Sequence, residues 1–209
     1  PADPNYGVWA AADCDGDGVT NGDEVIDGTD PFDPCSYLAA SQVIANVTAT
    51  WNNLDCDGDG VTNGDEIIDG TDPQDPCDYM AGSITGPQST SWDLLDCDGD
   101  GVTNGDEAAD GTDPQDPCDY VATSQTVGTS PAWDLLDCDG DGDPNGTDPD
   151  PQDPCAVTIQ TIPNPADPNY GVWAAADCDG DGEDNGTEVT NGTDPFDPCS
   201  VTIATIPNP

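Results

Sequence analysis

Residues 13–24 read Asp-Cys-Asp-Gly-Asp-Gly-Val-Thr-Asn-Gly-Asp-Glu. Asp stands at positions 1, 3 and 5 of this stretch, Gly at position 6, Asn at position 9 and Glu at position 12. This is the pattern of a twelve-residue calcium loop, because calcium takes about six to eight oxygen ligands at roughly 2.3–2.6 Å. The aspartates point inward on a tight curl, the glycine allows the turn, and the glutamate closes the shell with both oxygens. Without an ion, carboxylates this close would repel one another and unfold the loop.

The pattern recurs five times, and calcium is the predicted ligand of each copy. The predicted ligands, which include the backbone carbonyl of position 7, are Asp13, Asp15, Asp17, Val19, Asn21, Glu24, Asp55, Asp57, Asp59, Val61, Asn63, Glu66, Asp96, Asp98, Asp100, Val102, Asn104, Glu107, Asp137, Asp139, Asp141, Asp143, Asn145, Asp148, Asp177, Asp179, Asp181, Glu183, Asn185 and Glu188. The fourth loop is shortened and has Asp148 at position 12. Because Asp reaches less far than Glu, we expect this site to bind more weakly or through a water.

A second group of acids follows each complete loop in the segment Gly-Thr-Asp-Pro-x-Asp-Pro-Cys. Its members are Asp30, Asp33, Asp72, Asp75, Asp113, Asp116, Asp194 and Asp197. They are candidates to complete the first calcium shell or to hold a second ion. Asp-Pro pairs also form turns and caps without any metal, and the sequence leaves both interpretations open.

Ten cysteines recur at nearly regular spacing, namely Cys14, Cys35, Cys56, Cys77, Cys97, Cys118, Cys138, Cys155, Cys178 and Cys199. An even number at regular spacing predicts disulfides in an oxidising compartment, whereas a zinc site would need closer Cys pairs or His. Pairing within a repeat, as in Cys14 with Cys35, leaves no cysteine over. Pairing across repeats, as in Cys35 with Cys56, leaves Cys14 and Cys199. We expect the pairing within repeats.

Five tryptophans, each five residues before the first cysteine of a repeat, give a period near 41 residues. The predicted repeats are 1–41, 42–83, 84–124, 125–164 (with the shortened loop) and 165–209. Residues 1–18 recur unchanged at 165–182, so we expect a window of a longer repeat array.

The predicted fold is an irregular, calcium- and disulfide-stabilised tandem repeat, elongated and mostly loop. We expect one-turn helices such as Glu24–Ile26 and short β-strands in the spacers, for example at 157–162 and 201–206, where the sequence alternates partly in the two-residue period of a strand. Flexible Ser/Thr linkers are the alternative for the spacers. Tyrosines two residues after a cysteine are expected to pack with the tryptophans on the disulfide; these are Tyr37, Tyr79 and Tyr120.

Asp-x-Asp-Gly-Asp-Gly, then Asn, Glu and Gly-Thr-Asp-Pro, resembles the thrombospondin type-3 repeat in its bacterial surface-protein form, and the loop is similar to an EF-hand loop. The resemblance covers the five acidic segments, roughly half of the chain. It implies calcium ligation by the Asp and Glu residues named above, along an extended, disulfide-tied stalk with little regular structure. The long spacers and the shortened fourth loop depart from the family pattern.

The chain of 209 residues has no Lys, Arg or His and a formal net charge of -45. This composition excludes nucleic-acid binding through basic residues, His-based catalytic triads, Schiff-base lysines and His-ligated metals. The sequence also has no apolar run long enough to span a membrane. Low apolar content with extreme charge is typical of disorder unless a cation from the medium neutralises the chain. Asn46, in a spacer sequon, is the candidate glycosylation site.

The predicted function is an extracellular or cell-surface structural protein, a stalk or filament of tandem repeats that calcium makes rigid and that takes part in adhesion or self-association. The alternative is an acidic calcium reservoir or mineral-associated matrix protein, which would not need shaped loops. An enzyme that uses paired carboxylates is disfavoured, because active sites do not come in five near-identical copies.

Overall fold

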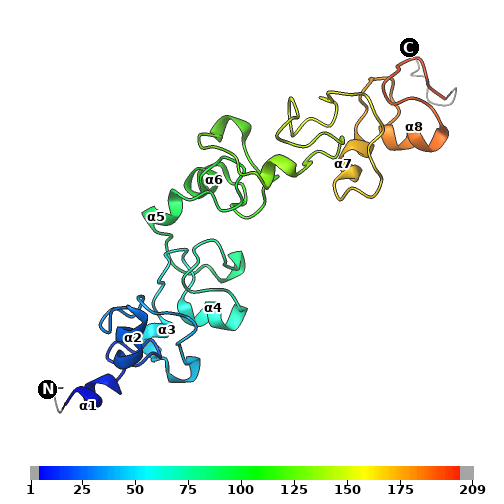
Figure 1. The fold of residues 1–209 in the computed structure, drawn as a ribbon. Helices are drawn as coiled ribbons and strands as arrows, with labels where there is room; N and C mark the ends of the chain where they lie inside the picture. Colours follow the sequence, from blue (N-terminus) through cyan, green and yellow to red (C-terminus); the bar gives the residue numbers. More distant parts are fainter. Residues whose placement is uncertain (1–4, 203–209) are drawn as a thin grey trace. The chain divides into compact units, whose positions relative to one another are not determined.

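The computed structural model describes residues 5–202, and in these residues short helices are the only regular elements. Figure 1 shows them as brief coils joined by long loops. The chain divides into two units, Pro1–Leu95 and Asp96–Pro209. No helix among the described residues is both long and apolar enough to cross a membrane.

The helices of the first unit are α1 (Tyr6–Ala10), α2 (Asn21–Asp27), η1 (Ile44–Asn46), α3 (Ala49–Asn52), α4 (Asn63–Asp69), η2 (Ala81–Ser83) and α5 (Thr90–Asp93). Those of the second unit are α6 (Asn104–Asp110), η3 (Ala122–Ser124), η4 (Trp133–Leu135), α7 (Tyr170–Ala175) and α8 (Asn185–Asn191). The η elements are 3₁₀ turns.

The helix that follows each complete acidic loop has seven residues, about two turns, so the prediction of one-turn helices is wrong here. The cap explains the difference in α2. The Thr20 hydroxyl accepts from the Asp23 N–H at 3.3 Å and donates to the Asp23 carboxylate at 2.7 Å, so the helix begins at Asn21. Gly28, with φ of 83°, ends the helix in the left-handed conformation.

The spacers form no strand among the described residues, so the predicted strands are wrong. The spacer instead folds back on the preceding loop, where Val43 N–H donates to Gly18 O at 3.0 Å and Thr48 N–H to Gly16 O at 2.9 Å. These backbone groups are therefore not available to a neighbouring strand. In the expected strand at 157–162, Thr158 N–H donates to the Asp143 carboxylate at 2.6 Å. Of the expected strand at 201–206, residues 203–206 lie outside the described part.

A small apolar core forms where the spacer crosses the loop. Trp51, Tyr37 and Val19 are all buried together, and the two rings meet edge to face with centroids 5.9 Å apart. Trp51 Nε1 donates to Pro34 O at 2.9 Å. The expected packing of tyrosine with tryptophan is confirmed, and the tryptophan comes from the following repeat. Equivalent clusters are Val61, Tyr79, Trp92 and Val102, Tyr120, Trp133.

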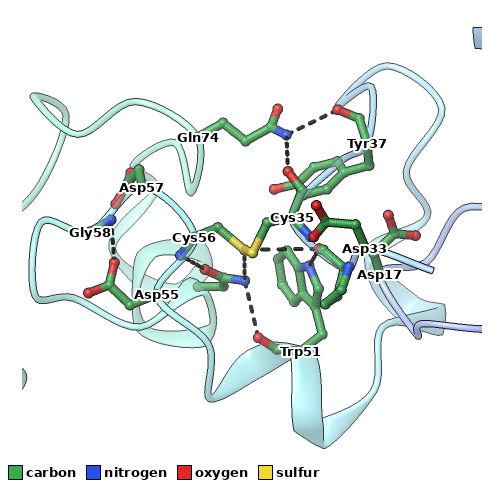
Figure 2. The surroundings of a disulfide bond; sticks show 12 residues. Asp17, Asp33, Cys35, Tyr37, Trp51, Asp55, Cys56, Asp57, Gly58 and Gln74 are labelled. Carbon is green, nitrogen blue, oxygen red and sulfur yellow. Dashed lines mark hydrogen bonds between the residues drawn. A yellow bond between two sulfur atoms is a disulfide. The ribbon is translucent and has the colours of Figure 1, made fainter. Parts of the chain in front are cut away.

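The disulfides join consecutive repeats, so the predicted pairing within repeats is wrong. Cys35 is bonded to Cys56 with the Cα atoms 5.3 Å apart. Figure 2 shows this bond with the rings of Tyr37 and Trp51 beside it. The physical reason is the core: Trp51 is held on Pro34 and Tyr37, and Cys56 follows Trp51 by five residues, so Cys56 lies beside Cys35.

The remaining cysteines follow the same alternation. Two further bonds are Cys118–Cys138 and Cys155–Cys178, and Cys77 and Cys97 are disulfide-bonded as well. Cys14 and Cys199 are free and exposed.

Removing the Trp51 ring should destabilise the fold far more than removing the equivalent Trp9 ring. Trp51→Ala empties a fully buried position and is expected to cost about 3–5 kcal/mol of unfolding free energy. Trp9 is only partly buried, so Trp9→Ala should cost less than half as much. Thermal unfolding of both variants in calcium measures the difference. Equal losses would show that the cores do not stabilise the repeats.

Candidate calcium sites

Each acidic loop is folded by hydrogen bonds from its own backbone to its aspartates. In the first loop, Asp13 accepts from Gly16 N–H at 2.7 Å and, through its other oxygen, from Gly18 N–H at 3.1 Å. Val19 N–H donates to Asp17 Oδ1 at 2.8 Å. Gly16 and Gly18 have φ of 85° and 90°, which glycine adopts without steric cost. The alternating Asp-Gly sequence therefore curls the chain around its own carboxylates.

The curl leaves a set of buried carboxylate oxygens without any hydrogen-bond partner. In the first loop these are Asp15 Oδ2, Asp17 Oδ2 and both oxygens of Glu24. Asp17 and Glu24 are fully buried. One ligand atom from each of Asp13, Asp15 and Asp17 lies within 4.8 Å of the others. That spacing suits oxygens that share one ion at about 2.3–2.6 Å, so these residues fit calcium.

The same arrangement occurs in all five loops. The other clustered triplets are Asp55, Asp57, Asp59; Asp96, Asp98, Asp100; Asp137, Asp139, Asp141; and Asp177, Asp179, Asp181. Both oxygens of the closing glutamate are buried without a partner in Glu66, Glu107 and Glu188 too. An unpaired buried charge costs several kcal/mol.

The electrostatics of the loops show how unfavourable the ionised acids are on their own. Burial, followed by the charges of Asp15 and Asp17, raises the pKa of Glu24 from 4.5 to about 7. The same causes raise the pKa of Glu66 to about 9 and that of Glu107 to about 8. The chain has no cationic side chain. Only protonation or a cation from the medium can relieve these sites.

The asparagine at position 9 bonds to the protein backbone. Asn21 Oδ1 accepts from Cys14 N–H at 3.1 Å, and its Nδ2 donates to Trp9 O at 2.9 Å. Asn21 thus joins the start of the loop to the tryptophan segment, a role that the sequence analysis did not identify. Its ligation of calcium, and that of the Val19 carbonyl, stay predictions. The Val19 side chain lies in the aromatic core.

The fourth loop keeps the acidic cluster but forms no helix. Thr147 N–H and Asp148 N–H both donate to Pro144 O, at 2.8 and 3.0 Å, which makes a single turn. One oxygen of Asp148 is buried without a partner, and the other accepts from Asp150 N–H at 2.9 Å. Asp148 thus offers one unpaired oxygen where the other loops offer two from Glu. This difference supports the expectation of weaker binding.

The fourth and fifth loops also replace the buried valine by an acid. Asp143 accepts from the backbone and hydroxyl of Thr158 at 2.6 and 2.5 Å. Glu183 accepts from the backbone and hydroxyl of Thr202 at 3.2 and 2.7 Å. In each case the acid and the threonine change together, so that a polar contact takes the place of the valine and tyrosine. These side chains were not distinguished from the other position 7 residues by sequence.

The second group of acids forms turns in the segment before each cysteine. Asp30 Oδ1 accepts from Phe32 N–H at 3.1 Å, and Asp33 Oδ1 from Cys35 N–H at 3.2 Å. Asp72, Asp75, Asp113, Asp116, Asp194 and Asp197 make the equivalent bonds. Asp30 also contributes to the raised pKa of Glu24, after burial and the loop aspartates. The turn role is therefore present, and metal binding by this group stays a prediction.

Asn46, the candidate glycosylation site, lies at the end of η1 and is exposed.

The glycines of the loops are expected to differ sharply in their tolerance of alanine. Gly58 and Gly70 both have positive φ, 85° and 83°, so alanine at either should cost roughly 1–2 kcal/mol from backbone strain. A Cβ at Gly58 would also lie 2.7 Å from the Ser89 Cβ, whereas one at Gly70 meets nothing within 4 Å. Gly58→Ala should therefore lower the thermal midpoint clearly more than Gly70→Ala. Equal midpoints would contradict the packing of spacer on loop.

Comparison with known families gives one match. The family model for the bacterial TSP3 repeat matches residues 13–34, 55–76, 96–117 and 177–198, which are the four complete acidic loops with the turns that follow them. The shortened fourth loop lies outside the matched residues. No curated protein and no solved structure matches the chain significantly.

Proposed function

Because this chain is a bacterial TSP3 repeat protein, we propose that it is an extracellular structural protein, a stalk or filament of tandem units that calcium makes rigid. The observation that carries the proposal is the set of four buried, unpaired carboxylate oxygens in each complete loop. Shaped loops of this kind favour a structural role over an acidic reservoir, which could use disordered Asp runs.

Calcium would be held by Asp13, Asp15, Asp17 and Glu24 in the first unit and by the equivalent residues of the other loops. It supplies positive charge to carboxylates that no side chain neutralises. The spacer is attached to the same loop through Gly16 and Gly18. Ordering the loop therefore also orders the spacer and the aromatic core, and the disulfide passes this order to the next repeat.

The extracellular location is supported by two features. Eight of the cysteines are disulfide-bonded, which is typical of oxidising compartments. Extracellular calcium modules bind with dissociation constants of about 10⁻⁴–10⁻³ M, so the sites would be filled where calcium is abundant. Such sites act as permanent braces and not as sensors.

The proposal is tested by removing calcium from the disulfide-bonded chain. We expect EDTA to abolish the near-ultraviolet circular dichroism of the buried tryptophans, to increase cleavage by an Asp-specific protease and to broaden the distance distribution in small-angle X-ray scattering. Added calcium should restore all three, whereas magnesium at the same concentration is the control. An unchanged dichroism and cleavage pattern in EDTA would contradict calcium-dependent rigidity.

A further inference from the structure

The start of the first unit exposes side chains that are covered where the same sequence occurs again. Residues 1–18 recur unchanged at 165–182, and residues 31–36 at 195–200. Phe32 is 69% exposed, whereas the equivalent Phe196 is partly buried and lies 6.3 Å from the Trp173 ring. Identical residues thus have a partner at one site and not at the other. We call the exposed set Tyr6, Trp9, Cys14 and Phe32 the head face.

Two other members of the head face show the same contrast. Trp9 is only partly buried, whereas Trp173 is fully buried. Cys14 is a free, exposed thiol, whereas Cys178 is bonded to Cys155. In the second unit these equivalents follow a preceding repeat that ends in Asp-Pro-Cys. The head face is therefore shaped for the end of another repeat.

The fifth repeat ends with the complementary features. Cys199 is free and exposed although it follows Asp-Pro, like Cys35 and Cys155, which are bonded to the next loop. Residues 199–209 have the sequence of residues 155–165 with changes at only two positions. A Cβ on Gly180 meets nothing within 4 Å, whereas the equivalent Gly140 is in close contact with the Asn169 carbonyl. We call Cys199 with the loop that contains Gly180 the tail end.

The junction inside the second unit shows how a tail and a head fit together. Cys155 and Cys178 have Cα atoms 5.2 Å apart, and the Cys178 sulfur lies 3.6 Å from Pro154 O. Asn169 Nδ2 donates to Asp137 O at 2.8 Å, so the incoming segment also binds the preceding calcium loop. The residues that make this junction are present, in the same order, at the head face and the tail end.

We propose that the head face of one copy docks on the tail end of a second copy of this chain, and that a Cys199–Cys14 disulfide then locks the two. The two thiols lose two protons and two electrons as the S–S bond forms, and an oxidant of the disulfide class, such as oxidised glutathione, is reduced to two thiols. The inference deepens the proposed function, on which it rests for the need to assemble. It specifies a polar, head-to-tail filament.

Complementary single variants test the pairing in the full chain. Cys14→Ser retains only the tail thiol and Cys199→Ser only the head thiol. With calcium and a glutathione redox buffer, a mixture of the two should give a covalent heterodimer, at least about tenfold more than the homodimers of either variant alone, because docking raises the effective concentration of the two thiols. Asp-specific digestion and mass spectrometry should find Cys199 joined to Cys14.

Docking itself is tested with a matched pair of substitutions in the Cys199→Ser chain. Phe32→Asp, on the head face, should reduce heterodimer yield several-fold, whereas Ile68→Asp changes a residue that is 80% exposed in α4 and should leave the yield unchanged. Homodimers as abundant as heterodimers, equal effects of the two substitutions, or native protein in which Cys14 and Cys199 bond elsewhere would overturn the inference.

The double variant Cys14→Ser/Cys199→Ser separates this inference from the proposed function. It retains every acidic loop and all the bonded cysteines. If calcium orders the double variant but the mixture forms no heterodimer, head-to-tail assembly is wrong and calcium rigidity stands. If calcium leaves the double variant unchanged, the proposed function is wrong whatever the mixture does.

Discussion

In calcium-free buffer the chain should be more stable near pH 4.5 than near pH 7.5, and saturating calcium should reverse this order. Burial raises the folded-state pKa of Glu24 and Glu188 to about 7, of Glu107 to about 8 and of Glu66 to about 9. The ordinary value is 4.5. Because the folded values are higher, the folded state binds protons more tightly than the unfolded state.

The sign of the pH dependence follows from these shifts. The stabilising contribution of each protonated glutamate is fully present below about pH 4.5 and is lost as pH rises through its folded pKa of about 7–9. Calcium needs ionised ligands, so its binding strengthens over the same range. Protonation and calcium are thus alternative ways to neutralise the same oxygens.

Thermal unfolding followed by tryptophan fluorescence checks this prediction. The chain would be prepared calcium-free on a chelating resin and measured at about pH 4.5 and about pH 7.5, with and without calcium. We expect the midpoint to fall with pH in the calcium-free samples and to rise with pH in the calcium samples. A calcium-free midpoint that rises with pH would contradict the burial of unpaired glutamates.

Glu66→Gln should remove calcium from the second loop and stabilise the calcium-free chain. Glu66 is fully buried and neither of its oxygens has a partner. Glutamine keeps the shape but loses the charge and one ligand oxygen. Because outer-shell changes alone cost roughly 10–100-fold in metal affinity, we expect at least that loss from a direct ligand. The calcium-free midpoint should rise, since the group with the largest pKa shift no longer ionises.

Asp65→Asn is the matched control because it removes the same charge from the same helix, α4. The Asp65 carboxylate accepts from the Thr62 hydroxyl at 2.9 Å and belongs to the helix cap. Equilibrium dialysis with metal analysis should show one bound calcium fewer in Glu66→Gln and an unchanged number in Asp65→Asn. If both variants bind as much calcium as the parent chain, Glu66 is not a ligand.

The acidic clusters were predictable from sequence because their geometry is local. Asp13, Asp15 and Asp17 are separated by single residues, and glycines between them allow the curl that brings their oxygens within 4.8 Å. The packing of Tyr37 with a tryptophan was also expected. The start of α2 was misplaced because the cap at Thr20 was not recognised as a helix signal.

The disulfide partners could not be predicted in the same way. Counting cysteines favoured pairs within repeats, whereas the structure bonds Cys35 to Cys56. The choice depends on how the spacer folds back over Gly16 and Gly18, a contact between residues about 30 positions apart. Alternating Val and Thr at 157–162 indicated a strand, but no neighbouring strand exists among the described residues to pair with it.

The sequence by itself determined the chemistry of this protein: five acidic loops, no internal cation and a regular supply of cysteines and aromatic residues. Only the tertiary structure decided how the units are joined. Trp51 leaves its own loop to complete the core of the preceding one, and this places Cys56 beside Cys35. The reason is physical: ligand spacing along a loop is set by neighbouring residues, whereas cross-linking depends on which distant surfaces bury the aromatic rings.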